Sequence, residues 1–208
     1  MICFPLAAVP CAAEEPAGVM LKEGFENGVK RWTILDPKTW RLSQHDANHT
    51  LEITARKSEY KPPHRSPGHI ALVRGLQLES FDITFKVRST KDTGNHRDCC
   101  IFFGYQDNRH FYYAHLGAKP DPASGQIMIV NEADRTPLTK NERKVPWTDG
   151  WHTVRLVRDY KTGKIDVYFD NMEKPQMSTV DKTFGAGSIG IGSFDDMNEF
   201  DEIVIRKQ

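Results

Sequence analysis

The sequence predicts an all-β protein built as a sandwich of two antiparallel sheets. Three observations indicate this class. Strand-like segments follow one another from residue 68 to the end, turn signals separate them about every ten residues, and helical periodicity is almost absent. A chain of 208 residues is long enough for one such domain with a substantial core.

The first part of the chain is expected to contribute short strands around residues 24–25, 40–42 and 51–53. The following segment YKPPHRSPG, residues 60–68, is expected to be a loop, because proline lacks the N–H group that a central strand needs. The segment FDITFKVRS, residues 81–89, alternates apolar and polar side chains and predicts a strand with one buried face.

The second part of the chain continues this pattern with hairpins and closing strands. Residues 99–117 predict two strands joined around residues 107–108, and residues 151–171 predict a hairpin with its tip near residues 162–163. Single strands are expected in GQIMIVN (125–131), GSIGIGSF (187–194) and FDEIVIRK (200–207).

The hairpin at residues 99–117 carries the candidate site. A two-residue turn at Asp107 and Asn108 pairs Gln106 with Arg109, and alternation then separates two faces. We expect the more aliphatic face to pack inward, with Cys99, Ile101, Phe103, Tyr105, His110, Tyr112, Ala114 and Leu116. The other face is expected to be an exposed binding surface, with Asp98, Cys100, Phe102, Gly104, Gln106, Arg109, Phe111, Tyr113 and His115.

The second face supplies the candidate functional residues, because it combines aromatic rings with the ionisable side chains of Asp98, Arg109 and His115. Its candidate catalytic residues are His115, Tyr113 and Asp98, since a histidine or tyrosine can act as a general base. The candidate ligand-binding residues are Asp98, Gln106, Arg109, Phe111, Tyr113 and His115.

The cysteines and charges exclude several other classes. Cys99 and Cys100 are neighbours in a strand and point to opposite faces, so a disulfide between them is not expected, and no Cys/His spacing is typical of zinc sites. The 28 basic and 28 acidic residues cancel, which gives no electrostatic reason to expect a nucleic acid partner.

Residues 1–13 resemble a secretory signal peptide, because an apolar stretch ends in small residues at Ala13. No other segment is apolar for long enough to span a membrane. We therefore expect residues 14–208 to form a single exported domain that is secreted, periplasmic or displayed at the cell surface.

Four segments carry a resemblance to a known superfamily. They are EGFENGVKRW (23–32), FFGYQDNRHFYYAHL (102–116), DGWHTVRLVRD (149–159) and GSIGIGSFDDMNEFDEIVI (187–205). The chain resembles the concanavalin A-like lectin and glucanase jelly rolls, which include laminin G-like domains and bacterial 3-keto-disaccharide hydrolase domains. The resemblance extends over roughly residues 21–206.

The resemblance implies two curved sheets with a carbohydrate groove on the concave one. It also implies a structural calcium ion between the first and last strands, where Glu23 and Asp201 match the acidic positions by their place in the sequence. The glucanase acid motif is absent, because only Glu132 and Asp134 of NEADR resemble it.

Two functions from different classes remain open. The first is a carbohydrate-binding module, and the second is a glycoside-cleaving enzyme of the keto-disaccharide hydrolase or lyase kind that uses the same face. Glycan binding with and without turnover distinguishes them, and the absence of both would favour a protein-interaction domain. Trp151 follows a glycine at the start of a strand and is expected to lie in the core.

Overall fold

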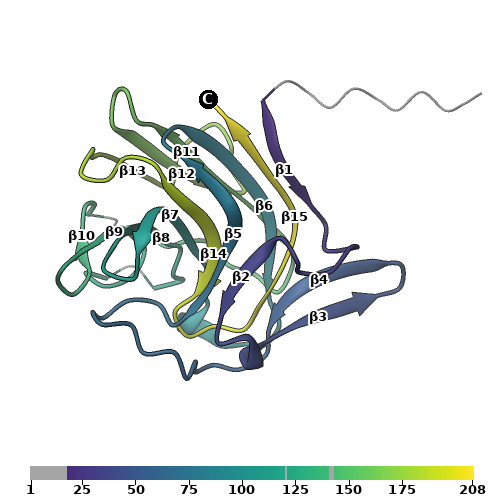
Figure 1. Cartoon of the computed structure of the whole chain (residues 1–208). Coiled ribbons are helices and arrows are strands. Elements are labelled where there is room, and N and C mark those ends of the chain that lie inside the picture. Colours follow the sequence, from purple (N-terminus) through teal and green to yellow (C-terminus); the bar gives the residue numbers. More distant parts are fainter. Residues whose placement is uncertain (1–17, 120, 141–142) are drawn as a thin grey trace, which may run out of the picture.

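The computed structural model describes residues 18–119, 121–140 and 143–208, so the predicted signal peptide at residues 1–13 lies outside the described residues. Within them the chain forms two antiparallel sheets that pack face to face (Figure 1). The prediction of an all-β sandwich is confirmed. In the described part of the chain, no helix is long and apolar enough to cross a membrane.

The first sheet has eight strands in the order β13-β12-β11-β6-β15-β4-β3, and β1 pairs with β15 beside this path. Its strands are β1 (Val19–Glu23), β3 (Trp40–His45), β4 (Asn48–Ile53), β6 (Phe81–Ser89), β11 (His152–Asp159), β12 (Lys164–Phe169), β13 (Met177–Val180) and β15 (Asn198–Lys207).

The second sheet has seven strands in the order β10-β9-β8-β7-β14-β5-β2. Its strands are β2 (Trp32–Leu35), β5 (His69–Leu78), β7 (Cys100–Asp107), β8 (His110–His115), β9 (Gln126–Asn131), β10 (Thr136–Pro137) and β14 (Gly187–Ser193). Two short 3-10 helices, Pro37–Thr39 and Gly94–His96, lie in connections.

The core between the sheets follows from the alternation read in the sequence. In β6 the side chains of Phe81, Ile83, Phe85 and Val87 all point into this core. The strand predicted around residues 24–25 lies earlier in the chain, because β1 ends at Glu23 and Phe25 has a φ of 62°, a left-handed conformation in which a strand cannot continue.

The β7–β8 hairpin keeps the predicted register over most of its length. Cys100 faces His115 and Phe102 faces Tyr113 across the ladder. Near the tip the register shifts, so Asp107 rather than Gln106 begins the turn. The turn is therefore placed one residue later than predicted.

Gly104 lies within this irregular stretch, at a position that only a glycine fits. Its φ is 53°, and a side chain would meet the ring of Tyr112 and the guanidinium of Arg158 at 3.1 Å. Tyr105 was expected on the inner face of the hairpin. The irregularity turns its side chain to the other face of the sheet, where it packs with Phe111.

The two faces of the hairpin separate as predicted in other respects. Cys99 and its inward-facing companions join the core between the sheets, whereas Cys100 belongs to a second apolar cluster on the other face. Both cysteines are free and point to opposite faces, as the strand geometry predicts, but Cys100 is buried although its face was expected to be exposed.

Candidate functional site

The outer face of the seven-stranded sheet, away from the core between the sheets, is covered rather than open. It holds a second apolar cluster, in which Phe111 is 1% and Tyr113 0% exposed. We call this set the outer cluster: Ile70, Leu72, Cys100, Phe102, Tyr105, Phe111, Tyr113, Met128 and Val130. The prediction that this face forms an exposed binding surface is wrong for the aromatic rings.

Loops distant in sequence provide this cover. Tyr60, in the proline-rich loop, packs against the outer cluster. The same loop is linked to the connection after β9, because the N–H of Arg135 donates to the carbonyl of Arg65 at 3.2 Å, and the N–H of Arg65 donates to Asp134 at 2.8 Å. The sequence shows the loop but not where it folds, so alternation alone could not reveal the cover.

Asp98 lies at the open end of the hairpin, two residues before β7, and is almost completely buried. Its Oδ1 accepts hydrogen bonds from the Ser193 hydroxyl at 3.0 Å and the Phe194 N–H at 2.8 Å, and its Oδ2 accepts one from the Asp195 N–H at 3.2 Å. Burial alone would raise the pKa of Asp98, but the neighbouring His115 and these donors outweigh it and lower the pKa. The carboxylate therefore ties the end of β14 to the hairpin.

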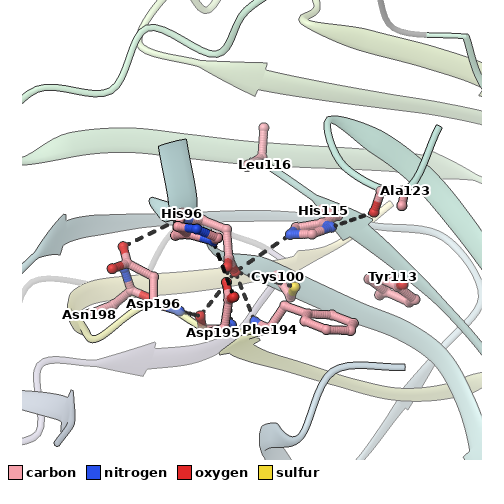
Figure 2. Close-up of polar contacts among 12 residues, drawn as sticks. His96, Cys100, Tyr113, His115, Leu116, Ala123, Phe194, Asp195, Asp196 and Asn198 are labelled. Atoms are coloured by element: carbon pink, nitrogen blue, oxygen red, sulfur yellow. Dashed lines mark hydrogen bonds and ion pairs between the residues drawn. The ribbon is translucent and has the colours of Figure 1, made fainter. Parts of the chain in front are cut away.

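His115 is the last residue of β8 and faces this carboxylate. Its Nδ1 lies 3.2 Å from the carbonyl oxygen of Ala123, to which only a protonated nitrogen can donate. Its Nε2 is buried, has no hydrogen-bond partner and lies 3.7 Å from Oδ1 of Asp98. Figure 2 shows the His115 ring between Ala123 on one side and the aspartates around Asp195 and Asp196 on the other.

A cavity of about 400 Å³ opens beside these two residues. We call it the His115 cavity, and its lining includes side chains from five separate segments: Arg65, Arg97, Asp98, His115, Arg135 and Phe194. The Phe194 ring stacks on the His115 ring, with centroids 5.7 Å apart.

Two guanidinium groups of this cavity lack a carboxylate partner among the described residues. The guanidinium carbon of Arg135 lies 4.3 Å and that of Arg65 5.8 Å from the centre of the Phe194 ring. Arg97, by contrast, pairs with Asp92 at 3.1 Å and with Asp149. Arg65 and Arg135 therefore keep charge available for a ligand, supported by an aromatic face.

The other predicted site residues do not join the His115 cavity. Gln106 and Arg109 lie exposed near the hairpin tip, where Arg109 pairs with Glu132 at 3.0 Å. Phe111 lies within the outer cluster. Tyr113 is also buried there, burial raises its pKa strongly, and its hydroxyl is 3.4 Å from Arg135. The structure therefore brings together Asp98 and His115, with Tyr113 behind them.

The predicted calcium residues lie at the β1–β15 edge. Glu23 accepts hydrogen bonds from the Phe25 N–H at 2.9 Å and the Trp32 indole N–H at 3.2 Å. Asp201 accepts one from the Asn48 amide at 2.9 Å and one from the N–H of the next residue at 2.6 Å. Each of the four carboxylate oxygens of Glu23 and Asp201 thus already accepts a hydrogen bond from an N–H group. The two residues fit a calcium site only if the same oxygens also bind the ion.

A second cavity, of about 570 Å³, lies over the eight-stranded sheet. Its buried carboxylates are already paired, because Glu52 lies 2.7 Å from Arg41 and Glu199 lies 2.7 Å from Arg88. Trp151 is 38% exposed beside it, with Arg88 over its ring at 4.8 Å. The expectation that Trp151 lies in the core is wrong.

Sequence reasoning missed several contributors to the His115 cavity, Arg97 among them. Arg65, Arg135 and Phe194 come from loops whose approach depends on long-range packing, so no local pattern marks them. Cys100 was correctly placed on the same face as Asp98 and His115 but was given no role.

Comparison with known proteins supports the fold. No protein-family model matches the chain, and no curated protein matches it. Among solved structures, it is similar to the carbohydrate binding module CBM66 from Bacillus subtilis, with a TM-score of 0.60 and 14% identity over 86% of this chain and 97% of that one.

Two further solved structures are similar to this chain. One is a protein of unknown function with a galectin-like fold from Bacillus subtilis, with a TM-score of 0.58 and 11% identity, covering 93% of this chain and 97% of that one. The other is domain 4 of AbnA, an extracellular arabinanase from Geobacillus stearothermophilus, in complex with arabinotriose, with a TM-score of 0.57 and 13% identity, covering 93% and 94%. At these identities the likeness shows the fold alone.

Proposed function

We propose that this chain is a carbohydrate-binding domain and that its ligand occupies the His115 cavity. Two of the similar structures support the general function, since one is named a carbohydrate binding module and another is a domain in complex with arabinotriose. The finer proposal, the location of the site, is argued from this chain's own residues.

The observation that carries the location is the presence, beside an aromatic ring, of two guanidinium groups that have no carboxylate partner in the described part of the chain. Arg65 and Arg135 offer planar arrays of N–H donors that fit the hydroxyl and carboxylate oxygens of a sugar. Phe194 supplies an apolar surface next to them. Because their charges lack carboxylate partners within the described residues, we expect sugars with an acidic group to bind more tightly than neutral ones.

The proposal includes export, since a secreted or surface-displayed domain would meet extracellular glycans. The predicted signal peptide at residues 1–13 motivates this location. Its test is the location of the protein in fractionated cells and the mature N-terminus, which is expected to follow Ala13. A cytoplasmic protein with its first residues intact would contradict this part of the proposal.

The contacts of Tyr113 and Asp98 do not favour glycoside cleavage. The buried Tyr113 holds its proton strongly, because burial raises its pKa, and a general base must give up that proton first. Asp98 is occupied by three hydrogen-bond donors that join it to the chain after β14. These contacts favour a binding role for the site.

Binding to a panel of neutral and acidic oligosaccharides and polysaccharides tests the proposal, with product analysis for turnover. Replacing Arg135 with alanine is expected to weaken glycan binding at least about tenfold, the loss of roughly one charged hydrogen bond. The control is Arg31→Ala, an exposed arginine before β2 that lies outside the cavity lining.

The possible results separate the two parts of the proposal. A panel with no bound glycan would overturn carbohydrate binding itself. Glycan binding that Arg135→Ala and Arg65→Ala leave unchanged would overturn the location in the His115 cavity. Thermal unfolding of each variant checks that weaker binding does not come from misfolding.

A further inference from the structure

Three side chains behind the His115 cavity combine the ligand types that zinc prefers. Asp98, Cys100 and His115 each offer one ligand atom, and these three atoms all lie within 4.8 Å of one another. Asp98 and Cys100 point to the same face because they are two residues apart, and His115 is the cross-strand neighbour of Cys100. The backbone pairing therefore fixes the cluster.

The separations are close to those of a coordination shell. Oδ1 of Asp98 lies 3.7 Å from Nε2 of His115 and 4.0 Å from Sγ of Cys100. Tetrahedral zinc, with bonds of 2.0–2.3 Å to oxygen, nitrogen and sulfur, places such atoms roughly 3.3–3.8 Å apart. Both separations from Oδ1 of Asp98 therefore lie within a few tenths of an ångström of this range.

The contacts of His115 provide a second indication. Its Nδ1 lies 3.2 Å from the carbonyl oxygen of Ala123. Its Nε2 is buried, has no hydrogen-bond partner among the described residues and lies 3.7 Å from Oδ1 of Asp98. A backbone carbonyl on the far nitrogen is how metal-bound histidines are oriented, with the other nitrogen directed at the ion.

The chemistry of the third ligand selects the metal. Cys100 is buried and free, and its sulfur makes only a long contact with Asp98. Sulfur and imidazole ligands favour zinc over calcium or magnesium. Asp98 and His115 also line the His115 cavity, so a fourth ligand can approach from that side.

We propose that Asp98, Cys100 and His115 bind one Zn²⁺ ion, with a fourth coordination position that opens toward the His115 cavity. The ion would bridge β7 and β8 at the end where the loop after β14 attaches. This proposal does not depend on carbohydrate binding. It concerns a different ion and different residues from the calcium site expected at Glu23 and Asp201.

The test uses the full mature chain without an affinity tag, stripped with a chelator and titrated with Zn²⁺ alone by calorimetry. One equivalent is expected to bind, with a rise in the unfolding temperature. A parallel titration with Co²⁺ is expected to produce a thiolate-to-cobalt charge-transfer band in the near ultraviolet, which reports a cysteine ligand directly.

Matched variants identify the ligands. Cys100→Ser is expected to abolish the charge-transfer band and to weaken Zn²⁺ binding at least about tenfold. Cys99→Ser is the control, because Cys99 is equally buried but faces the core between the sheets. His115→Gln is expected to behave like Cys100→Ser toward Zn²⁺.

The wild-type titrations decide the outcome even where a variant fails to fold. A wild-type chain that binds neither Zn²⁺ nor Co²⁺ would overturn the proposal. A bound ion without the charge-transfer band, or a band that survives Cys100→Ser, would also overturn it. Glycan binding by the metal-free chain is measured separately, so failure of one proposal is distinguishable from failure of the other.

Discussion

Replacing Phe111 with alanine tests whether the outer cluster is a second core. The ring is 1% exposed and contacts three others, with centroids 4.9 Å from Tyr105, 6.1 Å from Phe102 and 6.3 Å from Tyr113. Removing a buried phenylalanine side chain costs about 3–5 kcal/mol, because apolar contact is lost and a cavity remains. An open surface would lose less than about 1 kcal/mol on the same change.

Urea unfolding measures this difference. With a urea dependence of about 2–3 kcal/mol per molar, the unfolding midpoint of Phe111→Ala is expected to fall by about 1–2 M at unchanged slope. The control is Arg109→Ala on the same hairpin, where an exposed ion pair contributes less than about 1 kcal/mol. A midpoint for Phe111→Ala that matches this control would refute the claim that loops seal the outer face.

Two further predictions concern acid and calcium. Burial lowers the pKa of His69, although the nearby charges of Asp98 and Asp36 oppose this shift. As the pH falls below about 6.5, the unfolded state therefore binds a proton at His69 more readily than the folded state, and the free energy of unfolding decreases. His69→Gln is expected to show a shallower decline in the free energy of unfolding between about pH 7 and 5, by up to about 1.4 kcal/mol per pH unit; an unchanged slope would contradict this. If Glu23 and Asp201 share a calcium ion, calcium added to chelator-treated protein raises the unfolding temperature and Glu23→Gln removes the rise. An unfolding temperature of the wild-type chain that calcium leaves unchanged would contradict the calcium prediction.

Strand pairing was the most predictable part of this molecule. The alternation in residues 81–89 is matched by β6, and the cross-strand positions of Cys100 and His115 follow from a hairpin register that could be read directly. Local chemistry decides both, because side chains alternate and turns require particular residues. The register error near Gly104 arose because the sequence pattern did not reveal an irregularity.

The candidate site was predictable only where it depends on one hairpin. Asp98 and His115 were grouped correctly, since Asp98 comes just before β7 and His115 ends β8, and the pairing of these two strands is local. The exposure of Phe111 and Tyr113 was predicted wrongly, because the loops that cover them come from other parts of the chain. Phe194 and the two arginines beside it lie in loops as well, and nothing in their local sequence marks their approach.

The reactivity of the two adjacent cysteines reports how different parts of the protein open. One peptide bond separates thiols that belong to different hydrophobic compartments. An alkylating reagent can reach Cys100 once the covering loops lift, but Cys99 only when the two layers part. The ratio of the two labelling rates therefore distinguishes local breathing from global opening without any engineered probe.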